Sequence, residues 1–453
     1  MKQLKPITNK LLWIFALGQF GWSLLSGIVS NWMVYYYTGS PDAQNPNTGL
    51  FASGITQNPI LFKLTLFGLV LAAGRIFDAI TDPLIAGWSD RSNFKGGRRI
   101  PFMRAMAVPF ALCTIALFTL PQTANETLND TVLFVLLMVF YLFMTMFCTP
   151  YNALIAELGD TQQHRINVST FISFTFIVGQ SISFLLPNVA GALEPSVGQQ
   201  NSIRYAVALL SAIACLAMLF PAFYIKERDY IDSKPSETKP FRSLIQTFSN
   251  VQFRHFVYSD VIYFFALTLF QTGLAFYETK LMEIPDTMTF TLTATMTAIS
   301  VCLYPVVNIL AKKIGKKSLI IVGFFAYSVV FAITSLCGAG VHWGFIVAVT
   351  AAIPMAILGI LPQACVADVA ELTRLETGED RSGMFFAART FAFKMGQAIA
   401  LVVFTSLTVS KTADSYRATA IFAFVTCFIG AVIFFSYNEK LILGKIKELK
   451  GNE

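Results

Sequence analysis

The chain has 453 residues, of which 55% are hydrophobic and 13% charged, and its formal net charge is +7. Soluble globular proteins are about 45–50% apolar and about 25% charged, so this composition excludes a chain that faces water on all sides. Apolar stretches of about 20 residues, the length that crosses a bilayer as a helix, recur from end to end and predict an all-α membrane protein.

Twelve transmembrane helices are predicted in chain order. The first lacks the short apolar core and the small-residue cleavage site of a signal peptide. The expected spans are residues 11–38, 61–88, 104–121, 131–157, 167–192, 203–225, 255–279, 288–311, 318–337, 343–366, 383–409 and 417–437.

The spans divide into two six-helix halves. We expect an N-terminal bundle at 1–225, a polar cytoplasmic loop at 226–254, a C-terminal bundle at 255–437 and a cytoplasmic tail at 438–453. The loops "SDRSNFKGGRRIP" and "AKKIGKKS", six spans apart, are both basic and contain glycine, which suggests a duplicated unit. Such halves, with a site near the middle of the membrane between them, are typical of secondary transporters.

The basic residues predict the orientation. Most of the 33 Lys and Arg residues fall on the side of the two termini, which is therefore expected to be cytoplasmic. The opposite side holds Lys63, Arg204, Lys280, Lys411 and Arg417. The positive charge is thus a signal of membrane topology, and nothing about it indicates nucleic acid.

The segment "GRIFDAITDP", residues 74–83, places three charges inside the second span. Asp78 and Asp82 are one helical turn apart on the same face, and Arg75 lies close to that stripe. Each charge near the centre of a bilayer costs about 2.5–3.5 kcal/mol, so this face must look into the protein or a hydrated cavity. Two carboxylates this close can share Na⁺ or titrate with H⁺. The alternative is an ion-pair network that only joins helices.

The eleventh span carries two cations in "FFAARTFAFKMGQ". Arg389 and Lys394 are five residues apart, so at most one points straight at a given partner. Facing the acids of the second span, they would balance the interior charge. A guanidinium in the cavity would also favour an anionic substrate through bidentate pairing. A structural role is the alternative for both.

The sequence carries no signal of an enzyme or of a bound cofactor. The seven cysteines lie in apolar stretches without a C-x-x-C pair, and the three histidines match no ligand spacing. No Ser/His/Asp set and no H-E-x-x-H motif appears. A channel filter and a long soluble sensor domain are also missing from the sequence.

Three stretches carry a family resemblance: "DAITDPLIAGWSDR", "TPYNAL" and "LETGEDRSGMFFAARTFAFKMG". They resemble the glycoside-pentoside-hexuronide:cation symporters of the major facilitator superfamily, which include the melibiose permeases. The resemblance implies the major facilitator fold, with Asp78, Asp82 and Thr145 as ligands of the coupling cation and Lys394 in coupling. The first two patterns also resemble the sodium-dependent lysophospholipid symporters, which stay open as an alternative.

The sugar-binding residues of that family are replaced. Its galactoside-recognising members carry charged or aromatic residues where this chain has Ser23, Cys148, Asn152 and, nearby, Thr170. This argues against a melibiose-like substrate. We expect the substrate cavity to be lined by Ser23, Arg75, Cys148, Asn152, Thr170, Arg389, Thr390 and Lys394.

The inner loop "GWSDRSNFKGGRRIP" resembles the gate motif of the superfamily. The resemblance implies a cytoplasmic gate formed by Asp90, Arg91, Arg98 and Arg99. In the other half, we expect Asp368 to form a similar interlock. A plain positive-inside loop would explain the arginines but not Asp90. Exposed ion pairs are worth about 0–1 kcal/mol each, which suits a gate that opens and closes.

Together these signals predict a secondary active transporter that works by alternating access. It would couple Na⁺ or H⁺ to the symport of a sugar, a glycoside or a related polar, even anionic, solute, with a lysophospholipid as the alternative. We expect a multi-pass protein of the cell (inner) membrane, a functional monomer whose partners are its small-molecule substrate and membrane lipid.

Overall fold

The computed structural model describes residues 5–61, 63–92, 94–120, 125–158, 162–230, 247–377 and 382–451. The chain divides into two compact units, Met1–Gln57 with Ile80–Lys239, and Asn58–Ala79 with Pro240–Glu453. Helix α2 (Leu66–Arg91) is continuous and contributes its first half to the second unit and its second half to the first.

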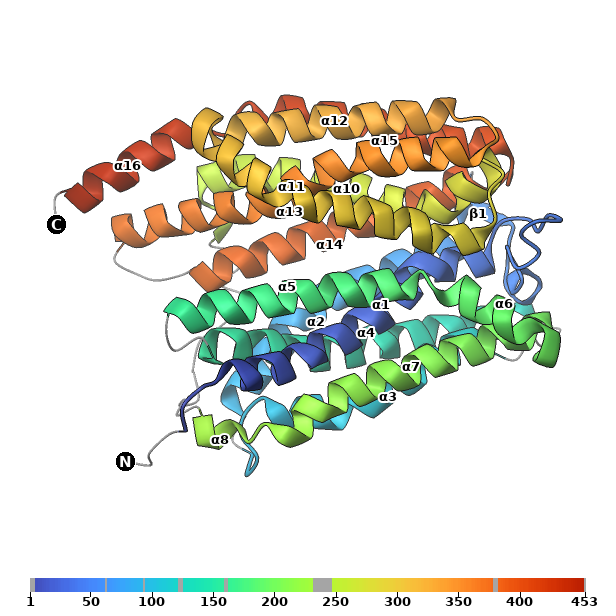
Figure 1. The fold of residues 1–453 in the computed structure, drawn as a ribbon, viewed down its shortest axis with the longest axis horizontal. Helices are drawn as coiled ribbons and strands as arrows, with labels where there is room; N and C mark the ends of the chain where they lie inside the picture. Colours follow the sequence, from blue (N-terminus) through green and yellow to red (C-terminus); the bar gives the residue numbers. More distant parts are fainter. Residues whose placement is uncertain are drawn as a thin grey trace. The chain divides into compact units, whose positions relative to one another are not determined.

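The first unit is built from long antiparallel helices (Figure 1). Besides the end of α2, it contains α1 (Asn9–Tyr37), the 3₁₀ turn η1 (Ala52–Gly54), α3 (Ile100–Thr119), α4 (Glu126–Leu158), α5 (Gln162–Ser183), α6 (Leu186–Val197), α7 (Gln199–Tyr224) and α8 (Glu227–Tyr230). The predicted fifth span is therefore two helices, because the helix breaks after Ser183 and α6 starts at Leu186 with Pro187 in its first turn.

The second unit opens with a small hairpin. Strands β1 (Pro59–Leu61) and β2 (Leu64–Thr65) pair antiparallel, with Leu61 opposite Leu64, so the predicted second span begins later than residue 61. The other elements are α10 (Val251–Phe276), the π-helical turn η2 (Tyr277–Leu281), η3 (Asp286–Met288), α11 (Thr289–Ile314), α12 (Lys316–Leu336), α13 (Val341–Thr377), α14 (Ser382–Leu407), α15 (Ala413–Phe434) and α16 (Glu439–Gly451).

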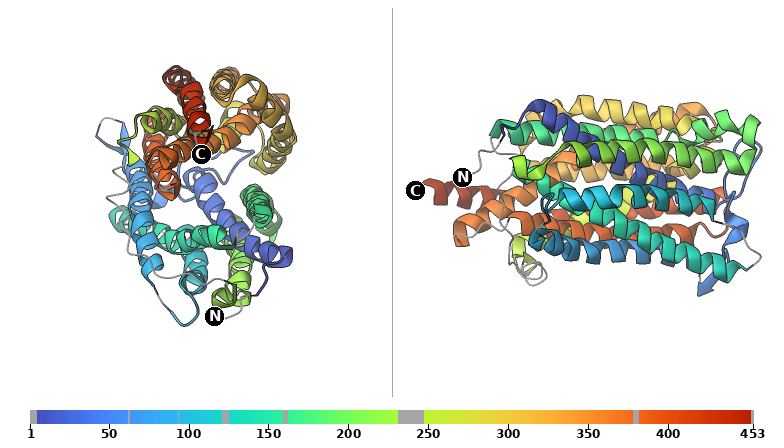
Figure 2. Two further views of the ribbon diagram at one scale, coloured as in Figure 1. Left: turned by 90° about the vertical axis from the view of Figure 1, so that its left-hand side faces the viewer. Right: turned by 90° about the horizontal axis from the view of Figure 1, so that it is seen from below.

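The helix pairs of one unit recur in the other, six spans later. In the first unit α1 packs on α5 and α7, and α3 packs on α4 and α7. In the second unit α10 packs on α14 and α15, and α12 packs on α13 and α15 (Figure 2). The two sets of pairings correspond element by element, as expected of a duplicated unit.

A glutamate cap also recurs. In the first unit the buried Glu227 carboxylate accepts backbone hydrogen bonds from Arg98, Arg99 and Ile100 at 2.7, 2.8 and 2.9 Å, where α3 begins. In the second unit the Glu439 carboxylate accepts from Lys316 and Lys317, at 2.9 and 2.8 Å, where α12 begins. Each acid follows the sixth span of its repeat and satisfies N–H groups that the third helix leaves unpaired.

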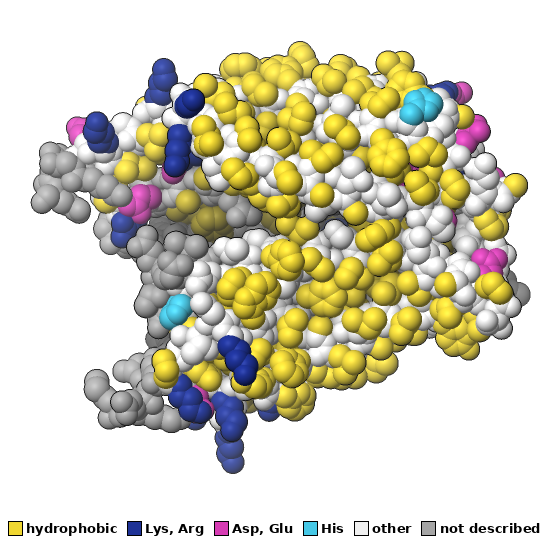
Figure 3. Space-filling view, viewed as in Figure 1, with side chains coloured by type: hydrophobic (Ala, Val, Ile, Leu, Met, Phe, Trp, Pro, Cys, Tyr) yellow, Lys and Arg dark blue, Asp and Glu magenta, His cyan; other side chains and the backbone are white. Residues whose placement is uncertain are grey.

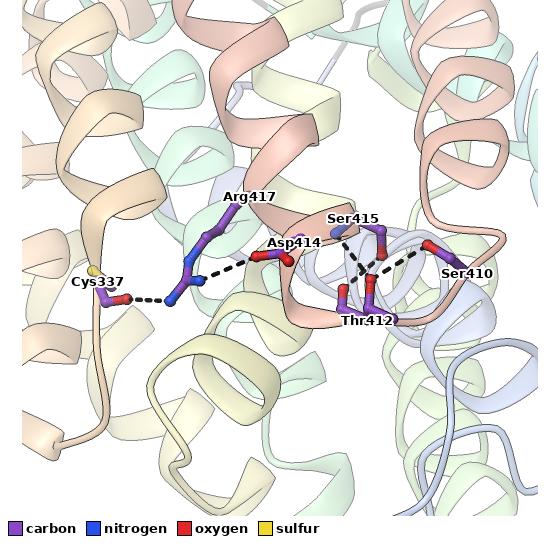
Figure 4. Close-up of polar contacts among 6 residues, drawn as sticks. All are labelled: Cys337, Ser410, Thr412, Asp414, Ser415 and Arg417. Atoms are coloured by element: carbon purple, nitrogen blue, oxygen red, sulfur yellow. Dashed lines mark hydrogen bonds and ion pairs between the residues drawn. The ribbon is translucent and has the colours of Figure 1, made fainter.

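A hydroxyl cap and a glycine mark the boundaries of three further helices of the second unit. Thr412 caps α15 by accepting from the Ser415 backbone, and Arg417 of that helix bonds Asp414 and the carbonyl oxygen of Cys337, where α12 ends (Figure 4). Gly315, at φ +87°, allows the tight turn between α11 and α12, since this φ is unfavourable for other residues.

The outer surfaces of the helices are apolar. Figure 3 shows hydrophobic side chains along the helices of each unit, and Leu216 on α7 and Leu336 on α12 are 68% and 78% exposed. Among the described residues, eleven helical segments are long and apolar enough to cross a membrane. Helix α2 is also 26 residues long but carries Arg75, Asp78 and Asp82. The prediction of a multi-pass all-α membrane protein is confirmed.

Candidate functional site

Asp78 forms a buried ion pair with Lys394 in the second unit. The Lys394 Nζ atom lies 2.8 Å from Asp78 Oδ2, and the two side chains are 11% and 0% exposed. The α2 segment before Asp78 approaches α14 closely. A Cβ atom added to Gly68 would lie only 2.0 Å from Thr405 Oγ1. Gly68 therefore lets α2 and α14 approach closely nearly three helical turns before Asp78, about 15 Å along α2.

Arg389, on the same helix as Lys394, has a different partner. Its guanidinium donates to both carboxylate oxygens of Asp260 on α10, at 2.7 and 2.9 Å. The rings of Phe256 and Phe264 lie 5.8 and 5.6 Å from the guanidinium carbon. Arg389 is thus neutralised within its own unit, and its partner is Asp260 instead of an acid of the second span.

Asp82 lies in the first unit, beside α4. It accepts a hydrogen bond from Thr149 Oγ1 at 3.3 Å. One turn away along the same contact, Thr81 Oγ1 donates to Thr145 Oγ1 at 3.4 Å, and both hydroxyl groups are buried. Thr145 and Thr149 are four residues apart on α4, so both face α2. The contact of α2 with α4 therefore carries a carboxylate and three hydroxyl oxygens.

Prolines lie inside both helices of this contact. Pro83 on α2 and Pro150 on α4 have no N–H group, so the carbonyl oxygens of Ala79 and Met146 receive no helical hydrogen bond from them. Backbone oxygens of this kind are additional ligands that a small cation can use.

The structure spreads the other predicted cavity residues over several environments. Arg75 is half-buried on α2, in the second unit. Ser23 is buried and its hydroxyl bonds the Phe20 carbonyl within α1, whereas the Thr390 hydroxyl bonds the Phe386 carbonyl within α14. The first unit also holds a buried Cys148 and an exposed Asn152 and Thr170.

The predicted gate residues also fall into separate environments. Arg98 and Arg99 are buried in the first unit, where their backbone N–H groups donate to the Glu227 carboxylate. The side chain of Arg99 donates from Nη1 to Ser89 Oγ at 3.2 Å. Asp368, on α13, pairs with Lys316 in the second unit. Arg91 is exposed at the end of α2, and the side chain of Asp90 lies outside the described residues.

Sequence reasoning missed four residues of these clusters: Thr81, Thr149, Glu227 and Asp260. Thr81 and Thr149 had a readable signal, since they lie three and four residues from Asp78 and Thr145 and so share their helix faces. Glu227 and Asp260 had no partner close in sequence, and only the fold brings them to Arg98, Arg99 and Arg389.

No resident metal centre is visible in the part of the chain that the structure describes. That part contains no group of three or more His, Cys, Asp or Glu side chains placed to hold a metal ion.

Repeated helix bundles with apolar outer surfaces and charges paired in their interior define a polytopic membrane transporter with the major facilitator fold. Residues 14–439 match the family described as "MFS/sugar transport protein", so the chain belongs to this family, among the glycoside-pentoside-hexuronide:cation symporters. The expectation of a transporter, not an enzyme, is confirmed.

Three similar proteins illustrate the match. The uncharacterized symporter sll1374 of Synechocystis is 34% identical over 40% of this chain and 36% of its own length. The uncharacterized symporter YnaJ of Bacillus subtilis is 23% identical over 86% of this chain and 80% of its own. A solved structure of a proton-dependent oligopeptide transporter aligns with 97% of this chain and 100% of its own, with a TM-score of 0.67 and 13% identity, which shows the fold alone.

Proposed function

We propose that the protein is a cation-coupled symporter of a sugar or glycoside and works by alternating access. The coupling cation would bind at Asp78 and Asp82, with Thr145 as a further ligand. The observation that carries this proposal is the buried pair between Asp78 and Lys394, with 2.8 Å between Oδ2 and Nζ.

The pair supplies a physical reason for coupling. A buried carboxylate without a counter-charge costs several kcal/mol, so Asp78 needs a positive partner in every state that excludes water. Lys394 fills that role in this structure. A coupling cation that replaces the ammonium group would free Lys394, and the carrier would then change its affinity for substrate. This is a difference in affinity between two states, as coupling requires.

The oxygens between α2 and α4 favour a small cation beside Asp82. Thr81, Thr145 and Thr149 bring three hydroxyl groups to this contact, and Pro83 leaves a backbone carbonyl oxygen without its helical donor. Both Na⁺ and H⁺ can use such a group of oxygens. The proposal therefore covers either coupling ion.

The pairing of Arg389 bears on the substrate class. Its two hydrogen bonds to Asp260 satisfy the guanidinium within the second unit, which removes the reason to expect an anionic solute. The family's description as sugar transport proteins favours a sugar or glycoside, and the pairing of Arg389 favours an uncharged one. We also propose that the carrier lies in the cell membrane as a functional monomer, with both termini cytoplasmic. Its cytoplasmic gate would be formed by Asp90, Arg91, Arg98, Arg99 and Asp368.

A thermal-shift screen of the purified protein tests this proposal. Neutral sugars, uronides and lysophospholipids are added one by one, with NaCl or with KCl at equal ionic strength and at two pH values. We expect a neutral sugar to raise the melting temperature, and the rise to grow with Na⁺ or with acidity. The variant Asp78→Asn should lose the ion dependence.

Three other outcomes of the thermal-shift screen would change the proposed substrate or contradict the proposed coupling. A lysophospholipid that stabilises the protein while no sugar does would replace the sugar by the lipid. A uronide as the only hit would restore the anionic substrate. A sugar effect that is independent of both Na⁺ and pH, in wild type as in Asp78→Asn, would contradict the proposed coupling.

A further inference from the structure

Another buried acid, Glu278, lies in the second unit. Glu278 occupies the π-helical turn η2, where the seventh span ends, and its side chain is 2% exposed. Turns of this kind are rare and occur often at functional sites. The transport mechanism proposed above does not use this residue.

The carboxyl group of Glu278 has a hydroxyl partner, and no cation partner among the described residues. Thr289 Oγ1, at the start of α11, donates to Glu278 Oε2 at 2.5 Å. Within the described residues, Glu278 makes no ion pair with a lysine or arginine. A buried carboxylate that lacks a counter-charge is costly, and the group avoids this cost by keeping its proton.

A cavity beside the carboxyl group contains an unsatisfied hydroxyl. The cavity, of about 10 Å³, is near the lower limit for one water molecule. Its wall includes Glu278 and Thr293, and otherwise mainly hydrocarbon from residues such as Leu292, Met296 and Val347. Thr293 is 5% exposed, and its Oγ1 atom has no hydrogen-bond partner among the described residues.

The charged groups on neighbouring elements do not neutralise Glu278. Asp286, on η3, is another buried acid nearby and supplies no positive charge, while Arg417 of α15 is engaged by Asp414 and the Cys337 carbonyl (Figure 4). On the same connection, Lys280 is half-buried and Glu283 is exposed, as is His342 at the start of α13. The Tyr277 hydroxyl is 2.9 Å from Thr419 Oγ1.

We propose that Glu278 is a proton-binding site, separate from the cation site of the second span. The Glu278 carboxyl group holds the proton, and one water molecule bridges this group to Thr293. Hard cations such as Ca²⁺ or Mg²⁺ take about six or more oxygen ligands. Here a carboxyl group and the hydroxyls of Thr289 and Thr293 meet an otherwise apolar wall, which favours a proton over a metal ion.

Infrared spectroscopy of the purified full-length protein at neutral pH tests this assignment. The wild-type spectrum minus that of Glu278→Gln should contain the C=O band of a protonated carboxylic acid, and the band should shift in D₂O. The control Glu283→Gln, which changes an exposed carboxylate on the same connection, should leave the band in place. Thr293→Val removes only the hydroxyl group and should shift the band without abolishing it.

Two results would overturn the proposal: no such band in the difference spectrum of wild type and Glu278→Gln, or an unchanged band in Thr293→Val. The second measurement also decides the matter if Glu278→Gln does not fold. Because the infrared band of Glu278 does not depend on transport, the variant Asp78→Asn/Asp82→Asn should keep this band. Failure of the cation site and failure of the Glu278 site are therefore distinguishable.

Discussion

The buried pair of Arg389 and Asp260 allows a quantitative prediction about the second unit. The two side chains are only 8% and 2% exposed and are joined by two hydrogen bonds of 2.7 and 2.9 Å. Removing one member of such a pair leaves an uncompensated charge, which costs about 3–5 kcal/mol, whereas replacing both with apolar residues is often neutral. We therefore expect Arg389→Met to be strongly destabilising and Asp260→Leu/Arg389→Met to recover most of the loss.

The two single variants should differ. In Asp260→Leu the guanidinium keeps the faces of Phe256 and Phe264, and a desolvated cation–π contact contributes about 2 kcal/mol. In Arg389→Met the carboxylate keeps no comparable partner, so this variant should be the less stable of the two. Equilibrium unfolding in mixed detergent micelles measures the free energies of unfolding.

The exposed pair of Arg374 and Glu371 supplies the control. Its side chains are 47% and 29% exposed, so Arg374→Met should cost less than about 1 kcal/mol. The reasoning is refuted if Arg389→Met is no worse than this control, or if the losses of the two single variants simply add in the double variant.

The remaining predictions concern helix contacts, caps and the interior lysine. Gly396→Ala should lower the free energy of unfolding by about 1–3 kcal/mol, because the new Cβ atom would lie 2.6 Å from the Val261 carbonyl oxygen. The control Gly359→Ala, with open space around the new Cβ atom, should be neutral or stabilising. Equilibrium unfolding of both variants measures the difference. Glu227→Ala should cost about 1–2 kcal/mol by removing the acceptor of three N–H groups, and equal stability of variant and wild type would contradict that role. Lys394→Met should lower the melting temperature, because Asp78 loses its positive partner. Adding Na⁺ or acid should raise the melting temperature of this variant by more than it raises that of wild type, because no ammonium group competes for Asp78. An equal or smaller increase would argue against competition.

Much of the fold was predictable because each span is limited by the thickness of a membrane. Long apolar stretches identify the helices directly, and even α2 was recognisable although it carries three charges. The break between α5 and α6 at Pro187, the β1–β2 hairpin and the helical form of α16 were missed. These are short or polar features to which hydropathy over a whole span is insensitive.

The candidate site was predictable where its residues share a helix and where interior charges had to balance, since Lys394 of the eleventh span does pair with Asp78 of the second. The spacing of Asp78 and Asp82 follows from helical periodicity, and so would Thr81 and Thr149. The partner of Arg389 could not be read in this way, because Asp260 lies 129 positions away on α10. The same holds for Glu227 and the start of α3, whose contact depends on how α8 folds back in its own unit.

The central claim is that Asp78 and Asp82 hold the coupling cation. Its most direct test is accumulation of a labelled sugar, one that stabilised the wild type in the thermal screen, in proteoliposomes with an imposed Na⁺ or H⁺ gradient. Wild type should concentrate the sugar under at least one gradient. Asp78→Asn/Asp82→Asn should at most equilibrate it. Uphill accumulation by the double variant at the wild-type level would contradict the account.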